Sequence, residues 1–154
     1  GNFDDVFQTV LKFKRDGRPV FRFDYRIEKI TSLDGQEEKE TSKLKGKRLL
    51  LSSGIANPQS FSKLLKLEEG CPVAEMRFED HHNYSESSIR NMIEQGKNTP
   101  HDFWLTTEKD AVKLQSFQQQ LKQLWVVKMK IQPDPEWPAF FNRFLDGLSK
   151  TSLN

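Results

Sequence analysis

From Arg48 onward, short apolar runs alternate with segments whose apolar residues have helical spacing. The runs predict four strands, at residues 49–53, 73–78, 103–106 and 124–131. Helices are predicted between them, at residues 61–67, 89–93 and 111–121, and a last helix over 137–148. Strands that alternate with helices are typical of α/β domains whose sheet is mostly parallel. We therefore predict a three-layer α/β/α sandwich with a mostly parallel sheet.

The first 47 residues have a different character from the rest. A short helix is predicted over residues 3–14 and a strand over 20–27, where apolar and polar residues alternate. Residues 31–47 are mainly Ser, Gly, Glu and Lys, so we expect an exposed loop that adds nothing to the core. The chain is thus predicted to comprise a helix, β-ribbon and polar loop at 1–47 and an α/β domain at 48–154.

Charge and cysteine content limit the classes of function. The chain has 24 basic and 22 acidic side chains, well mixed, and a net charge of +2. Because this balance creates no strong single-sign field, we do not expect a nucleic-acid partner. A single cysteine, Cys71, cannot form an internal disulfide, and no secretory or long apolar segment occurs in the sequence. These features predict a soluble protein of a reducing compartment, with the cytoplasm as its location.

Three polar corners are predicted where strands end and helices begin, which is where parallel sheets bind ligands. In the first corner, Gly54 permits an unusual turn, Asn57 can cap the next helix and Pro58 suits its first position. A well-made turn and a binding loop would both use these residues, so the sequence leaves the two interpretations open.

The second corner holds two adjacent histidines beside carboxylates. Asp80, His81 and His82 follow a predicted strand directly. A carboxylate next to an imidazole fixes its tautomer and favours its charged form, as an acid–base site requires. An ordinary polar loop would have the same composition. A zinc site is disfavoured, because adjacent histidines rarely point at one metal and Cys71 is the single available thiol.

The third corner begins the predicted helix after residue 106. Thr107 and Asp110 have capping-box spacing, which would account for both residues. Capping does not account for Glu108 and Lys109, which either form a solvated pair or face a ligand at the same edge of the sheet.

The sequence lacks the usual loops for nucleotide phosphates. Gly46-Lys47-Arg48 is similar to the end of a phosphate-binding loop, but it precedes a strand, whereas such a loop follows a strand and opens a helix. Thr41 stands where the loop needs another glycine, and no Gly-x-Gly-x-x-Gly pattern occurs. We expect that this chain by itself does not bind the phosphates of a nucleotide in either way.

Three segments that include these corners follow one another in an order and at separations that can be compared with known families. They are Gly54-Ile55-Ala56-Asn57-Pro58 followed by Phe61, Asp80-His81 with Tyr84, and Thr106-Thr107-Glu108-Lys109-Asp110-Ala111-Val112-Lys113. In these segments the chain resembles the C-terminal domain of the tetraacyldisaccharide 4'-kinases, which belong to the lipid A pathway of Gram-negative bacteria. The resemblance runs from about Pro19 to Val127, and the last segment is its most specific part.

The resemblance implies a reaction and a division of labour. In that family an N-terminal domain holds a P-loop and the acidic residues for Mg2+, and the C-terminal domain supplies a histidine, which matches His81 of this sequence; His82 is outside the shared pattern. The implied reaction transfers the γ-phosphate of ATP to the 4'-hydroxyl of a lipid-linked disaccharide 1-phosphate at the cytoplasmic side of the inner membrane. The implied partners are the N-terminal P-loop domain, this lipid substrate and the membrane surface. The chain departs from the family in lacking the P-loop half.

These observations lead to specific site predictions. We expect His81 and Asp80 to be catalytic, no residue to bind a metal, and the other polar residues of the corners to face substrate or nucleotide: Gly54, Asn57, Thr107, Glu108, Lys109 and Asp110. The expected function is that of a kinase half that is inactive alone. The alternatives are a free-standing α/β binding module and a metal-dependent hydrolase that uses His81 and His82.

Overall fold

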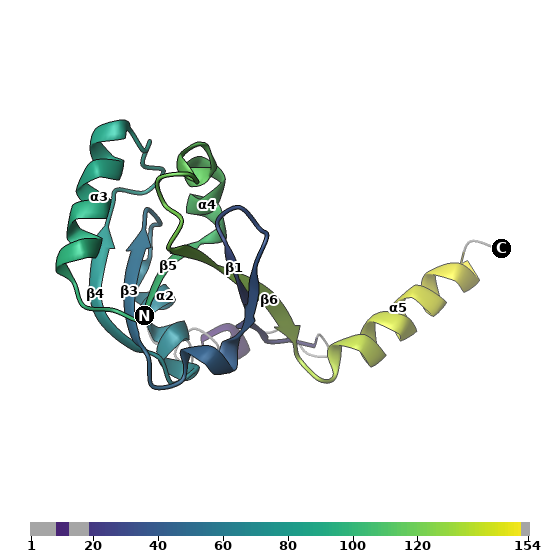
Figure 1. The fold of residues 1–154 in the computed structure, drawn as a ribbon. Helices are drawn as coiled ribbons and strands as arrows, with labels where there is room; N and C mark the ends of the chain where they lie inside the picture. Colours follow the sequence, from purple (N-terminus) through teal and green to yellow (C-terminus); the bar gives the residue numbers. More distant parts are fainter. Residues whose placement is uncertain (1–8, 13–18, 152–154) are drawn as a thin grey trace. The chain divides into compact units, whose positions relative to one another are not determined.

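The computed structural model describes residues 9–12 and 19–151. It contains a six-stranded sheet, and α2 lies on one face of it and α3 and α4 on the other (Figure 1). The elements in order are β1 (Phe23–Ser32), β2 (Glu38–Glu40), η1 (Thr41–Leu44), β3 (Arg48–Ser53), α2 (Pro58–Leu67), β4 (Cys71–Arg77), α3 (Glu86–Asn98), β5 (Phe103–Thr107), α4 (Glu108–Leu114), η2 (Gln115–Phe117), β6 (Leu124–Pro133) and α5 (Trp137–Thr151). The four strands and the helices predicted after Arg48 are all present.

The order of the strands is β2-β1-β6-β5-β3-β4. Strand β3 pairs in parallel with β4 on one side and with β5 on the other, and β5 pairs in parallel with β6. Strands β1 and β2 form an antiparallel hairpin at the far edge. The predicted α/β class with a mostly parallel sheet is therefore confirmed.

Two apolar clusters fill the space between the sheet and its helices. Successive residues of β3 point to opposite faces, as in any strand. On one face Leu49 and Leu51 pack with Phe61 of α2. On the other face Leu50 packs in one cluster with Ile89 of α3 and with residues of α4. Because both faces are covered, the ends of the strands are the part of the sheet that polar loops can reach.

The prediction of a featureless polar loop at 31–47 is wrong. The segment contains β2 and η1, and it buries Leu33 and Leu44 in the two clusters. The Lys29 ammonium donates to Glu38 across the hairpin at 2.7 Å. A strand at the edge of a sheet needs few apolar residues of its own. Here a charged cross-strand pair and the buried Leu33 and Leu44 on either side of β2 hold it in position.

The chain divides into two compact units, Tyr25–Lys130 and a unit made of the two chain ends, Gly1–Asp24 with Ile131–Asn154. This division does not coincide with the boundary expected at 47/48. In the unit of the chain ends, Trp137 makes edge contacts with Phe21 and Phe23 and stacks on Phe141. Of the helix predicted over 3–14, residues 9–12 are helical and the rest lies outside the described residues.

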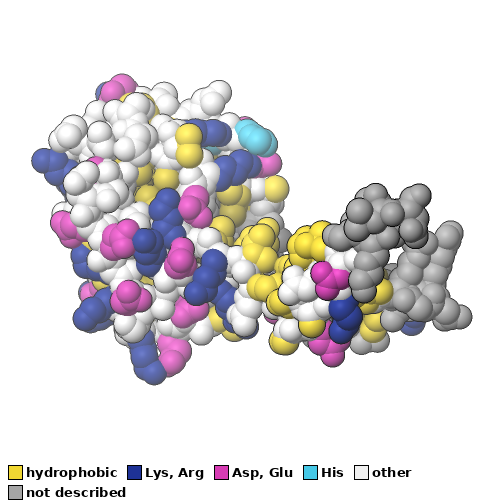
Figure 2. Space-filling model, turned by 90° about the vertical axis from the view of Figure 1, so that its right-hand side faces the viewer, with side chains coloured by type: hydrophobic (Ala, Val, Ile, Leu, Met, Phe, Trp, Pro, Cys, Tyr) yellow, Lys and Arg dark blue, Asp and Glu magenta, His cyan; other side chains and the backbone are white. Residues whose placement is uncertain are grey.

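The surface of the described residues carries both charges. On the face in Figure 2, basic and acidic side chains lie intermingled over the part of the molecule that contains the sheet.

None of the helices in the described part of the chain combines the length and apolarity needed to cross a bilayer.

Candidate functional site at the carboxyl edge of the sheet

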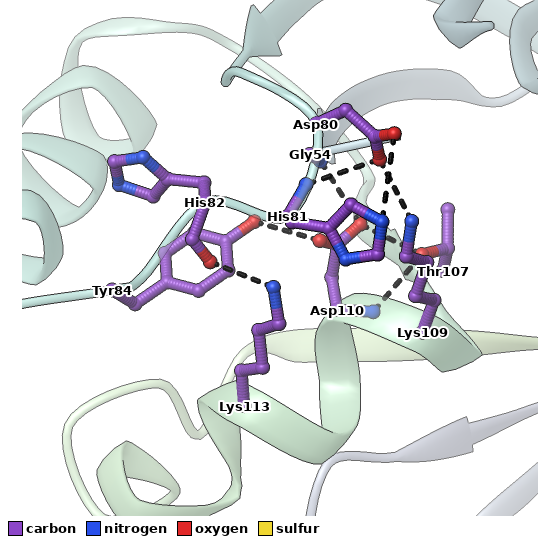
Figure 3. A network of polar contacts seen from close by, with 9 residues as sticks. All are labelled: Gly54, Asp80, His81, His82, Tyr84, Thr107, Lys109, Asp110 and Lys113. Atoms are coloured by element: carbon purple, nitrogen blue, oxygen red, sulfur yellow. Dashed lines mark hydrogen bonds and ion pairs between the residues drawn. The ribbon is translucent and has the colours of Figure 1, made fainter. Parts of the chain in front are cut away.

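The three predicted corners meet at one edge of the sheet. Parallel pairing aligns Ser53 of β3 with Arg77 of β4, and Ser52 with Thr106 of β5, so these strands end side by side. The Phe78 amide donates to the Ser53 carbonyl at 2.9 Å and joins the loops that follow β3 and β4. The Gly54 turn therefore shares this edge with Asp80 and His81, as the parallel arrangement of the predicted strands implies (Figure 3).

A buried carboxylate joins the three corners. Asp110 is fully buried, and its Oδ2 accepts from the Gly54 amide at 3.0 Å and from the Thr107 hydroxyl at 2.7 Å. Its Oδ1 accepts from the Tyr84 hydroxyl at 3.1 Å. The Thr107 oxygen in turn accepts from the Asp110 amide at 3.2 Å, which completes the predicted helix cap. We call these four residues the Asp110 network.

Gly54 is required for space within this network. A Cβ there would lie 3.1 Å from Asp110 Oδ1, 3.2 Å from the Glu79 carbonyl oxygen and 3.3 Å from the Tyr84 hydroxyl. The backbone of Gly54 is not left-handed, so the unusual turn expected from the sequence does not explain the glycine. Glycine is needed because neighbouring atoms approach its Cα too closely for a side chain. Burial and the neighbouring Asp110 carboxylate raise the pKa of the Tyr84 phenol well above its ordinary value, so Tyr84 remains a donor.

Three charged or ionisable side chains, Asp80, His81 and Lys109, lie beside this network, and we call them the charged corner. The Lys109 ammonium donates to Asp80 Oδ1 at 2.7 Å, and His81 Nε2 lies 3.7 Å from Asp80 Oδ2. The hydrogen bond from Lys109, followed by the charge of a protonated His81, lowers the pKa of Asp80 below its ordinary value. Asp80 is thus a carboxylate at neutral pH, placed between an imidazole and an ammonium group (Figure 3).

His81 has an unusual backbone conformation. Its φ angle is 61°, in the left-handed region that few residues other than glycine adopt. The Asp80 carboxylate accepts from the His81 amide at 3.0 Å, and the His82 amide donates to the Glu79 carbonyl at 3.0 Å, which holds the turn. The side chain is 75% exposed. Such backbone strain, of about 1–3 kcal/mol, is concentrated at functional sites.

His82 takes the opposite direction and packs into the loop. Its ring lies 4.9 Å from both the Phe78 and Tyr84 rings, and Nε2 is 3.2 Å from the Ser88 hydroxyl. The Lys113 ammonium donates to the His82 carbonyl at 2.9 Å. The two adjacent histidines therefore point apart. Among the described residues, no three His, Cys, Asp or Glu side chains come together as metal ligands would.

Three of the residues predicted to face substrate or nucleotide have other contacts. Asp110 is fully buried, and its carboxylate accepts from three donors. Asn57 accepts from the Ser60 amide at 3.1 Å and caps α2. Glu108 accepts from Lys128 and from the Met129 amide, both at 3.1 Å, and is held against β6. Helix capping explains the position of Asn57, and an ion pair between α4 and β6 explains that of Glu108.

Sequence reasoning missed two features of this edge. Tyr84 is the link between the loop and Asp110, but 26 residues separate the two and no local pattern marks the pair. An apolar cavity of about 340 Å3 opens beside Lys109. Residues from several distant segments line it: Tyr25, Ile55, Ser60, Phe61, Leu64, Thr107, Lys109 and Met129.

Comparison with known proteins identifies the family. The fold is an α/β domain that carries an imidazole, a carboxylate and an ammonium group at the carboxyl edge of its mostly parallel sheet. Residues 5–148 match the family model of the tetraacyldisaccharide-1-P 4'-kinases (LpxK), and the chain belongs to this family.

Individual relatives agree with this assignment. A tetraacyldisaccharide 4'-kinase of Bdellovibrio bacteriovorus is 30% identical over 114 residues, which are 74% of this chain and 34% of the relative. One of Chelativorans is 31% identical over 122 residues, covering 79% and 32%. The crystal structure of LpxK from Aquifex aeolicus in complex with ATP has a TM-score of 0.54 and 26% identity, covering 86% of this chain and 38% of that one. The chain thus spans about a third of the length of the curated relatives it matches.

Proposed function

We propose that this chain is the C-terminal half of a kinase that transfers the γ-phosphate of ATP to the 4'-hydroxyl of a lipid A disaccharide 1-phosphate precursor, and that it is inactive alone. The charged corner carries the proposal, because the loop after β4 and the start of α4 bring an exposed imidazole, a carboxylate and an ammonium group together at one edge of the sheet. Family membership and the fraction of the relatives' length that the chain spans support it.

In this proposal His81 orients the sugar hydroxyl and receives its proton. Phosphoryl transfer needs a positioned nucleophile and stabilisation of the charge on the transferred group. The Asp80 carboxylate, 3.7 Å from the His81 ring, favours the protonated imidazole that results. Lys109 adds a cation at the same edge, where an anionic phosphate can approach it.

ATP and Mg2+ would be bound chiefly by an N-terminal P-loop domain of the same protein. The described residues offer a cation to a phosphate group, but they do not gather the carboxylates that Mg2+ prefers. Bound MgATP supplies the transferred phosphoryl group. The proposed location is the cytoplasmic side of the inner membrane, where the lipid-linked disaccharide would be presented.

The alternatives have less support. A free-standing binding module is not favoured, because most of the chain matches the kinase family. The matched part makes up about a third of a longer kinase. A hydrolase that uses His81 and His82 together is not favoured, because the two rings point apart.

The test compares the two histidines in the intact parent protein. We expect His81→Ala to lower turnover of phosphate transfer by about a hundredfold or more, as loss of a general base does. His82→Ala is the matched control and should retain far more activity if the protein folds. Equal and small losses in both variants, with folding verified by circular dichroism, would refute the assignment of His81.

A further inference from the structure

Lys113 of α4 contacts the loop that carries His81, outside the charged corner. Its ammonium group extends from the helix to the loop and donates to the His82 carbonyl at 2.9 Å, in a partly buried position (Figure 3). A hydrogen bond from a charged donor is stronger than one between neutral groups. Because the acceptor is a backbone atom, the contact does not depend on the side chain of His82. Lys113 therefore fixes the backbone at the residue that directly follows His81.

The turn at His81 depends on contacts of this kind. The His82 amide donates to the Glu79 carbonyl at 3.0 Å, so residues 79–82 form a tight turn, and His81 has its φ of 61° within it. A residue with a Cβ keeps such a left-handed conformation only where the surrounding structure holds it there. Most of the His81 side chain is exposed, so its own packing contributes little. The neighbouring residues of the loop must supply the contacts that hold the turn.

Helix α4 holds both neighbours of His81. Lys109 and Lys113 are four positions apart, which places their side chains on the same side of the helix. The Lys109 ammonium donates to the Asp80 carboxylate at 2.7 Å, and the Lys113 ammonium donates to the His82 carbonyl. The first bond ends on a partly exposed side chain, whereas the second ends on the backbone itself. Lys113 therefore restrains the backbone of the turn more directly than Lys109 does.

We infer that Lys113 is a positioning residue, which holds the turn in its left-handed conformation and thereby sets where the His81 imidazole stands at the edge of the sheet. The inference rests on the proposed function for what the imidazole does there. Lys113 acts through His81 and does not itself touch the substrate. A merely structural lysine would stabilise the fold without affecting the conformation or the action of His81, and two measurements separate these roles.

The first measurement is the conformation of the turn in this chain. A positive φ brings the amide proton close to the Hα of the same residue, so His81 should give a strong intraresidue nuclear Overhauser effect (NOE). Lys113→Met removes the donor and keeps a side chain of similar length, and we expect it to weaken this NOE. Lys113→Arg keeps a cationic donor and should retain it. Lys63→Met, at an exposed lysine of α2, is the matched control and should leave it unchanged. An unaltered His81 NOE in Lys113→Met would overturn the inference.

The second measurement is a double-mutant cycle in the parent enzyme. We expect Lys113→Met to lower turnover by about ten- to hundredfold with KM for ATP unchanged, because a displaced catalytic group loses rate without loss of binding. Lys113→Arg should recover most of the activity. In a His81→Ala background, Lys113→Met should cause no further loss, because the group that it positions is absent. An equal loss in both backgrounds would show that Lys113 acts independently of His81 and would overturn the inference.

The two measurements distinguish failure of this inference from failure of the proposed function. Unchanged turnover in His81→Ala would refute the acid–base assignment, and the NOE would still decide whether Lys113 sets the turn. A large loss in His81→Ala with unchanged turnover in Lys113→Met would overturn the positioning role and leave the kinase assignment intact. If circular dichroism shows that Lys113→Met does not fold, Lys113→Gln, which is uncharged and shorter, replaces it in both measurements with the same expected results.

Discussion

Replacing Asp110 by asparagine tests whether one buried carboxylate holds the loops of the carboxyl edge together. The asparagine side chain has the same shape, but one of its two acceptor oxygens becomes a donor group. That donor group then faces either the Tyr84 hydroxyl or the Gly54 amide, each of which donates to Asp110 in the original protein. A buried donor without an acceptor costs about 1–3 kcal/mol, and the remaining bonds lose the strengthening that the charge gave them. We expect the free energy of unfolding to fall by about 3 kcal/mol in total.

Urea unfolding followed by tryptophan fluorescence measures this loss. Trp104 is a suitable probe, because it is buried and its indole N–H donates to Ser52 at 2.6 Å. Tyr84→Phe removes one of the three bonds and should cost about 1 kcal/mol. A domain of this kind has roughly 5–15 kcal/mol of stability, so both variants should remain folded in water.

Asp102→Asn is the matched control. Asp102 also accepts from a backbone amide, that of Arg48 at 2.7 Å, but its side chain is 35% exposed and water can replace the lost bond. Its loss should be clearly smaller than that of Asp110→Asn. Equal losses at the two positions, or an unchanged urea midpoint for Asp110→Asn, would show that the Asp110 network does not hold the loops of this edge together.

Three further outcomes are expected. Thr106→Val should leave the free energy of unfolding in urea unchanged or raise it by up to about 1 kcal/mol, because within the described part of the chain the buried Thr106 hydroxyl has no hydrogen-bond partner; a large loss would reveal a partner for that hydroxyl. The lowered pKa of Asp80 means that its ion pair with Lys109 stabilises the fold above pH 3.8 and is lost as the pH falls further. In an NMR titration of the carboxyl carbon, Lys109→Met should move the Asp80 midpoint up towards 3.8, and an unmoved midpoint would show that Lys109 is not the cause of the lowered pKa. Calorimetric titration of this chain alone with MgATP should show weak binding or none, since its sequence has no phosphate loop, and micromolar binding would contradict that expectation.

Much of the fold could be predicted because its signals are local. The apolar runs of β3 to β6 and the helical spacing between them mark strands and helices by residue pattern alone. Parallel strands end at the same edge, so the meeting of the Gly54 turn with Asp80 and His81 also followed from the sequence. The predicted β-ribbon near the start of the chain is confirmed by the hairpin of β1 and β2, but the place of β2 was not predicted. This short polar strand is stabilised by pairing with a neighbour and not by its own composition.

The sequence by itself determined which residues stand at the strand ends and which of them cap helices, since caps depend on residues three positions apart. Only the tertiary structure decided what those residues do there. It buried Asp110 between Gly54 and Tyr84, turned His82 into the loop, and left His81 exposed with a left-handed backbone. It also assembled the apolar cavity beside Lys109 from five separate segments. These features depend on contacts between residues far apart in the chain, whose partners are fixed only when the strands take their places in the sheet.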